Sequence, residues 1–156
     1  MTFIAGPYTY TLAASSLGIS EDGFRLRIAN RGDAIRGDNL GASIQDFVYR
    51  GADLTLETTL QEYDAAGAQS AFWPYDAVLG EHGQAGILAS SVAGALVLTA
   101  VAGTTAAAAP ASLTGTLSVL PPDFNVDLLF AARLRNVPLQ FQLLPTGSPV
   151  AWFTTT

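Results

Sequence analysis

The side chains that usually act as nucleophiles, bases and metal ligands are scarce in this chain of 156 residues. Cysteine is absent, which excludes disulfides, thiolate metal sites and cysteine nucleophiles. The single histidine, His82, rules out zinc sites that need several histidines from one chain. His82 lies in a turn-like context beside Gly83, and no G-x-S-x-G nucleophile elbow occurs. We therefore expect no Ser-His-Asp triad.

Paired carboxylates are the other source of acid–base chemistry, because glycoside hydrolysis needs two at a controlled separation. Close pairs occur at Glu21 with Asp22, at Glu62 with Asp64, and at Asp123 with Asp127. A chain with 13 Asp and Glu offers such pairs without any catalytic role, and solvated charges or helix caps explain them better. An acidic hydrolase stays as an alternative.

Glycine-rich segments give no better evidence for a bound cofactor or metal. The glycines at 80, 83 and 86 match neither the dinucleotide fingerprint nor a phosphate loop with its lysine. Asp38 and Asn39 lie among glycines, but the spaced ligand series of an EF-hand is missing. The sequence predicts no enzyme, with no catalytic residue, no cofactor and no metal.

The charge content is unusual for a domain that stands alone in water. Charged residues make up 13% of the chain and hydrophobic residues 49%, and the net charge is −6. That charged fraction is roughly half of what soluble domains carry. All seven cations are arginines; lysine, which protein interfaces disfavour, is absent. This pattern favours a subunit covered by copies of itself over an acidic monomer, which remains the alternative, and it disfavours a protein that grips nucleic acid through phosphates.

A membrane span is not expected. Residues 83–122 carry no charge, but serines, glycines and Pro110 interrupt their apolar run. The nearest flanking charges, Glu81 and Asp123, are acidic, whereas spanning helices are anchored by Lys and Arg. The first ten residues lack a basic segment followed by a long apolar one, so we expect no secretory signal.

Alternation of apolar and polar residues with period two dominates the chain and predicts half-buried strands. It is clearest at residues 8–12, 24–28, 53–59, 113–119 and 139–143, with further strands expected at 44–49, 94–100, 124–133 and 150–154. One short helix is predicted from Asp64, as its cap, to Pro74, while residues 83–92 fit either a helical turn or a loop. Residues 31–42 hold three glycines and two aspartates and predict a long hairpin loop. The expected fold is mainly β: an antiparallel β-sandwich or barrel with one short flanking α-helix, in a single domain over residues 1–156.

Seven runs of the sequence together carry a resemblance to a known protein family. They are FIAGPYTY, EDGF, IRGDNLGASIQDFVYRGADLTLETTLQEYDAA, FWPYDAVLGEHGQAG, GALVLTAVAG, LLFAARLRNVPLQFQLLP and WFTTT. Along nearly the whole chain this pattern of turns and strands resembles the tail tube (major tail) proteins of tailed bacteriophages.

The resemblance implies a structural subunit of the virion. Six copies would form a homohexameric ring, and rings would stack into a tail tube that conducts double-stranded DNA from capsid to host. The implied partners are further copies of the chain, the tape measure protein, the terminator and the baseplate or tip. DNA would occupy the lumen transiently without specific binding, and no membrane is involved. The location would be the virion tail, and the host cytoplasm during assembly. The alternative is another β-rich virion protein, a tail terminator or a capsid decoration protein.

The same interpretation also predicts roles for particular residues. In the family a long loop between strands contacts neighbouring subunits, and residues 31–42 match it by position and composition. The inter-subunit loop candidates are Arg31, Asp33, Arg36, Asp38 and Asn39.

Charged residues on the adjoining strands complete the prediction. Asp53 and Glu57, on one polar strand face, are candidates for an acidic or neutral lumen wall, which would not hold DNA. The alternative places that face in bulk solvent outside. Arg25 and Arg27 are candidates for ion pairs with carboxylates across a subunit boundary, because arginine suits bidentate contacts.

Overall fold

The computed structural model describes residues 8–38, 41–63, 74–75, 85–101, 112–125, 136–147 and 151–155. These residues form seven strands and one helical turn. In chain order they are β1 (Tyr8–Leu12), β2 (Ser15–Arg36), β3 (Ile44–Tyr63), α2 (Ala89–Val92), β4 (Gly94–Ala100), β5 (Ser112–Val119), β6 (Val137–Leu144) and β7 (Phe153–Thr155). The predicted mainly β, antiparallel fold is confirmed.

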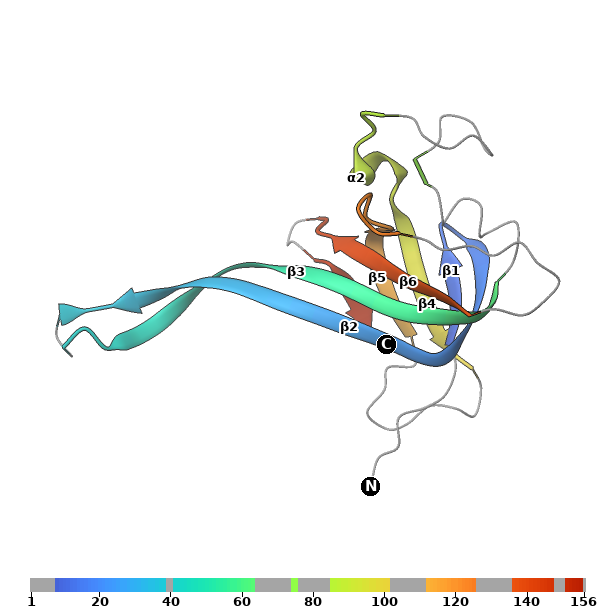
Figure 1. Cartoon of the computed structure of the whole chain (residues 1–156). Coiled ribbons are helices and arrows are strands. Elements are labelled where there is room, and N and C mark those ends of the chain that lie inside the picture. The colour runs from blue at the N-terminus through green and yellow to red at the C-terminus, as the bar shows by residue number, and fades with distance from the viewer. Residues whose placement is uncertain are drawn as a thin grey trace, which may run out of the picture.

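Six of the strands close into a barrel with a long hairpin projecting from it (Figure 1). The order around the barrel is β1, β2, β3, β6, β5 and β4, and pairing of β4 with β1 completes the circle. β7 pairs with β5 at three positions, beyond the last β5–β6 pair. Every pairing is antiparallel. The hairpin of β2 and β3 extends well past the other strands, so the barrel has one large protrusion.

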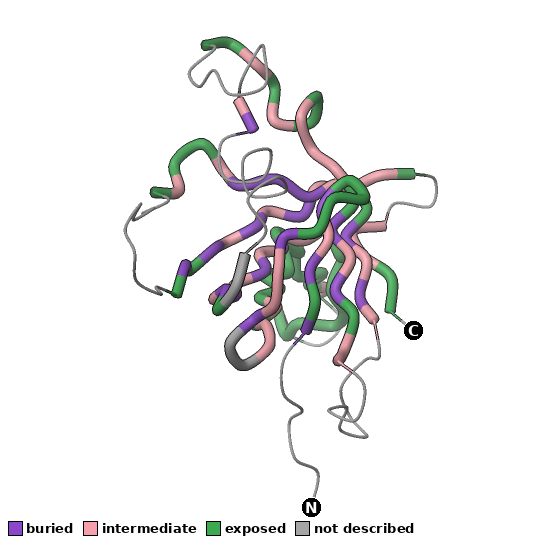
Figure 2. The backbone as a smooth tube through the Cα atoms, turned by 90° about the vertical axis from the view of Figure 1, so that its right-hand side faces the viewer, coloured by how far each residue is buried: buried purple, intermediate pink, exposed green. Residues whose placement is uncertain are grey.

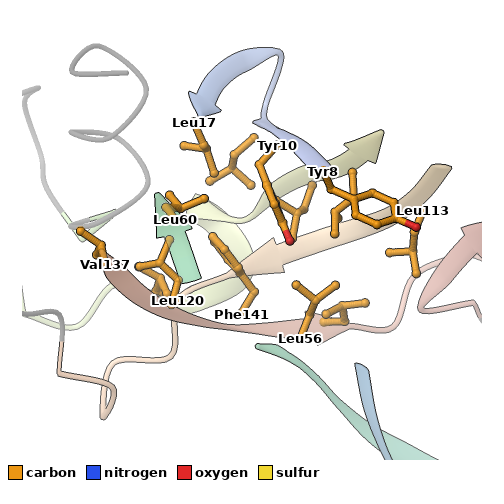
Figure 3. Close-up of a cluster of buried hydrophobic side chains, with 14 of the residues drawn as sticks. Tyr8, Tyr10, Leu17, Leu56, Leu60, Leu113, Leu120, Val137 and Phe141 are labelled. Carbon is orange, nitrogen blue, oxygen red and sulfur yellow. The ribbon is translucent and has the colours of Figure 1, made fainter. Parts of the chain in front are cut away.

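The alternating strands place their apolar residues inside the barrel. β6 shows it most plainly: Val137, Leu139, Phe141 and Leu143 are buried, while the residues between them are partly or fully exposed. Figure 3 shows Phe141 beside Leu56, Leu60 and other buried side chains from β1, β5 and the segment after β5. Burial of a Leu or Phe side chain contributes about 1.5–3 kcal/mol, so this cluster stabilises the barrel.

A tight turn of two alanines joins β1 to β2. Ala13 and Ala14 stand between the paired residues Leu12 and Ser15 and have φ angles of 49° and 67°. Two positive φ angles are typical of a type I′ turn, in which Asn-Gly is the usual sequence. The Ala13 amide donates a 3.0 Å hydrogen bond to the Ala95 carbonyl, which links the turn to the start of β4. Since the left-handed conformation costs an alanine roughly 1–2 kcal/mol, tertiary contacts hold this turn in place.

The strands around the hairpin are longer than the sequence predicts. The expected strands at 44–49 and 53–59 are parts of one strand, β3, and the expected strand at 24–28 is part of β2, which begins at Ser15. The prediction of a loop over residues 31–42 is wrong for residues 31–36, which pair with β3 from Gly51 back to Ile44. Two register shifts, after Arg31 and after Ile35, let the backbone ladder continue although the side chains show no single period.

The remaining expectations lie mostly outside the described residues. The predicted helix at 64–74 does so except for Pro74, which is buried. Residues 83–92 include a single helical turn, α2. Phe124 and Asn125, at the start of an expected strand, are not in a strand, and residues 126–133 are outside the described part. His82 is outside it as well.

Candidate assembly arm and polar face

The projecting part of the β2–β3 hairpin is the most distinctive surface of the molecule. We call it the arm and define it as residues 28–38 and 41–53, which begin where the β3–β6 pairing ends, at Leu54 with Leu143. Arg36 lies eight residues after Ile28, and at about 3.4 Å per residue the paired antiparallel strands extend about 27 Å. All described residues at 27–36 and 41–50 are exposed. Figure 2 looks along the arm, which lies behind the barrel in that view.

Large apolar side chains are concentrated on this exposed arm. Among the described residues, seven large hydrophobic side chains are exposed, and six of them belong to the arm: Ile28, Ile35, Ile44, Phe47, Val48 and Tyr49. Phe47 is 67% exposed and Tyr49 is 60% exposed. A hairpin of two strands is marginally stable by itself in water, and contiguous exposed apolar surface marks interaction sites. The arm therefore has the properties of a segment that packs against a partner.

The register of the arm places the rings of Phe47 and Tyr49 on the same face of the hairpin. Gly32 pairs with Tyr49 and Ala34 pairs with Phe47, so both rings stand beside residues with little or no side chain. A Cβ on Gly32 would lie 2.8 Å from the Val48 carbonyl oxygen, so a larger residue would push the strands apart. We call Gly32, Ala34, Phe47 and Tyr49 the aromatic face.

A buried polar cluster lies in the barrel at the register shift of β2 between Ser20 and Phe24, before the arm begins at Ile28. Thr58 Oγ1 donates to Tyr10 Oη at 2.7 Å, and Tyr10 Oη donates to the Gly23 carbonyl at 3.2 Å. The Tyr8 amide donates to Ser20 Oγ at 2.9 Å. Burial raises the pKa of Tyr10 to about 12, because its charged form would lose solvation. These bonds link β1 and β3 to β2 at that register shift.

The outward side of β2, β3 and β6 carries ordered rows of polar side chains, which we call the polar face. One row joins Arg25, Glu57 and Gln140, and the next joins Arg27, Thr55 and Gln142. Their neighbours in sequence, such as Leu56, point into the core. The alternation predicted for residues 53–59 is thus confirmed.

Both carboxylates predicted for a lumen wall have arginine partners on this face. Glu57 Oε1 is 3.3 Å from Arg27 Nε, and Glu57 Oε2 is 4.0 Å from Arg25 Nη1. Arg31 Nε donates to Asp53 Oδ2 at 2.9 Å, and its Nη2 also contacts that oxygen. Three arginines and two carboxylates give this group a net charge of about +1, so the group is not acidic. Arg25 and Arg27 contact Glu57 within the chain, and their pairing across a subunit boundary stays a prediction.

Of the predicted inter-subunit loop residues that the structure describes, Arg31 lies near the base of the arm, and Asp33, Arg36 and Asp38 lie closer to its tip. Asp33 Oδ2 accepts a 2.8 Å hydrogen bond from Arg50 Nε. Arg36 Nη1 donates to the Ala42 carbonyl at 2.9 Å, across the turn that follows β2. Asp38 is exposed beside that turn, and Asn39 lies outside the described residues. No structural result contradicts a role in contacts between copies, which stays a prediction.

Sequence reasoning missed the apolar residues of the arm. The consecutive residues Phe47, Val48 and Tyr49 give the signal, because a strand with one buried face does not carry three large apolar residues in a row. Such a run indicates a strand whose two faces both meet protein.

A shallow groove of about 510 Å³ lies at the barrel end of the polar face. Phe24, Phe124 and Pro138 form its apolar part, and Arg25 and Glu57 line it as well. The Arg25 and Glu57 side chains that line it pair with each other, and Thr58, also in the lining, donates a hydrogen bond to Tyr10 Oη.

The described residues contain neither a cluster of metal ligands nor a membrane-spanning helix. In this part of the chain no three carboxylate or imidazole groups come close enough to bind a metal ion together. No helix among the described residues is long and apolar enough to cross a bilayer. No family model matches the chain, and none of the curated proteins matches it.

Proposed function

We propose that this chain is a structural subunit of a bacteriophage tail tube, which assembles as stacked rings, hexameric by resemblance, around a lumen that conducts double-stranded DNA. The observation that carries the proposal is the arm: a paired hairpin that extends about 27 Å from a closed barrel and exposes six large apolar side chains. A monomer gains nothing from such a segment, whereas a subunit whose neighbours cover it buries the apolar surface.

The arm and the barrel are different surfaces, so a contact between them is heterologous. Heterologous contacts close into rings or continue as filaments, which are the two levels of order in a stacked tube. The low charged fraction and the absence of lysine support burial of a large part of the surface between copies.

Free strand edges supply a second kind of contact. Within the described residues, no strand pairs with β2 beyond Ile19 on the side away from β3, and β7 pairs only with β5. Unpaired edges are templates for strands of another chain. We propose that such edges join copies within a ring while the arm joins one ring to the next.

The experiment deletes most of the arm and rejoins β2 and β3 at two residues that pair with each other. Residues 31–51 are replaced by Asn-Gly, which joins the paired residues Asn30 and Ala52 through a two-residue turn. The barrel core is untouched, so the shortened chain should fold, as checked by circular dichroism and thermal unfolding. The unmodified chain should form rings or tubes in negative-stain electron microscopy at high concentration, and the shortened chain should not.

Several outcomes would count against the proposal. An unmodified chain that stays monomeric at every concentration, or normal tubes from the shortened chain, would contradict it. Single rings that never stack would favour a tail terminator, and trimers or monomers that bind capsids would favour a decoration protein.

A further inference from the structure

Three arginines stand in a row on one side of β2. Arg25, Arg27 and Arg31 are separated by two and four residues, so they share the outward side of the strand. Their side chains are 59–71% exposed even though each lies beside a carboxylate. Five of the seven arginines of the chain fall between residues 25 and 50, so the β2–β3 hairpin carries most of the arginines.

The spacing of this row fits a phosphate backbone. Residues two apart in a strand are separated by about 6.7 Å. Phosphates of one DNA strand advance about 3.4 Å per nucleotide along the helix axis while they wind around it, and long arginine side chains at this spacing can reach several phosphates of one strand. Guanidinium groups bind phosphate oxygens in pairs of parallel hydrogen bonds. Uncovered, the row has the chemistry of a binding surface for duplex DNA.

The carboxylates of β3 occupy the positions that phosphates would take. Glu57 stands between Arg25 and Arg27 and directs one oxygen toward each, at 4.0 Å and 3.3 Å. Asp53 accepts from Arg31. Both carboxylates belong to the strand paired with β2, so the fold holds them beside the arginines continuously.

We propose that Arg25, Arg27 and Arg31 form a masked binding site for the phosphates of double-stranded DNA, and that Glu57 and Asp53 mask it. The choice of DNA as the partner rests on the proposed function. With the mask in place the row has one uncompensated positive charge, which is too little to hold DNA. A tube wall built in this way stays wetted by charged groups and still lets DNA slide.

The test removes the mask and measures binding to a fluorescent 30-base-pair duplex by anisotropy. The variant Glu57→Gln with Asp53→Asn keeps the size of both side chains. If each freed arginine contacts one phosphate, the slope of log K against log salt becomes about −2.7, which is a roughly 40-fold loss of affinity between 50 and 200 mM salt. The unmodified protein should show no measurable binding at 50 mM salt.

A matched control separates the mask from net charge. Asp38→Asn with Asp46→Asn makes the same change in charge on the arm, where neither carboxylate forms an ion pair among the described residues. This control should bind no DNA. Adding Arg25→Gln, Arg27→Gln and Arg31→Gln to the unmasked variant should abolish its binding.

The single variants keep the test decisive if the double variant fails to fold. Glu57→Gln alone frees two arginines and should give a slope of about −1.8, and Asp53→Asn alone should give about −0.9. Folded variants that gain no binding, or equal gains in the control, would overturn the proposal. Because binding is measured on the purified protein, gained binding without tubes would contradict the tail-tube function alone, and tubes without gained binding would contradict the mask alone.

Discussion

Truncating Phe47 tests whether the arm works by burying its apolar side chains. The side chain is 67% exposed and belongs to the aromatic face. A phenylalanine presents about 200 Å² of surface, so complete cover by a partner would bury about 130 Å² and contribute about 3 kcal/mol at 25 cal/mol per Å². Phe47→Ala should therefore weaken each contact by about 2–3 kcal/mol, which is about a 30- to 150-fold loss of affinity.

The same substitution should leave the isolated subunit almost unchanged. The ring contacts little within its own chain, and surface substitutions usually change the free energy of unfolding by no more than about 0.5 kcal/mol. Thermal unfolding at low concentration measures this effect. Light scattering against concentration, with negative-stain images at each step, measures assembly, whose threshold should rise at least about tenfold.

Leu88→Ala is the matched control. Leu88 is 73% exposed and precedes α2, away from the arm. The Leu88→Ala substitution removes a similarly exposed apolar side chain and should leave the assembly threshold unchanged. Assembly of Phe47→Ala at the threshold of the unmodified protein, or an equal rise in both variants, would refute the role of the aromatic face.

Two further predictions concern the barrel. The pKa of Tyr10 rises from 10.0 when unfolded to about 12 when folded, so its contribution is complete below pH 10 and is lost as the pH rises to 12, a total of about 2.7 kcal/mol. Urea unfolding at pH 9.5 and 11.5 should show about two thirds of this loss in the unmodified protein and a smaller loss in Tyr10→Phe; equal losses would contradict the assignment. Ala14→Gly should raise the free energy of unfolding by about 0.5–1 kcal/mol, since glycine adopts a positive φ without cost, and a fall in the melting temperature would show that the turn is not strained.

The core of the barrel is predictable because its signal is local. Alternation at residues 8–12 and 139–143 already separates buried from exposed side chains, and Tyr8, Tyr10, Leu139 and Phe141 are in the core as expected. The polar face of residues 53–59 follows from the same period of two.

The arm and its ion pairs depend on long-range pairing, and only the tertiary structure decides them. Residues 31–36 look like a loop because glycines and aspartates disfavour strands locally, yet the ladder with β3 compensates for this and passes through two register shifts. The partners of Asp53 and Glu57 likewise depend on that register, since a slip of one residue would turn these side chains into the core. The sequence by itself determined a mainly β chain with an apolar interior and few charges; which strands lengthen into an arm, and which arginine meets which carboxylate, follow from cross-strand contacts that no local pattern contains.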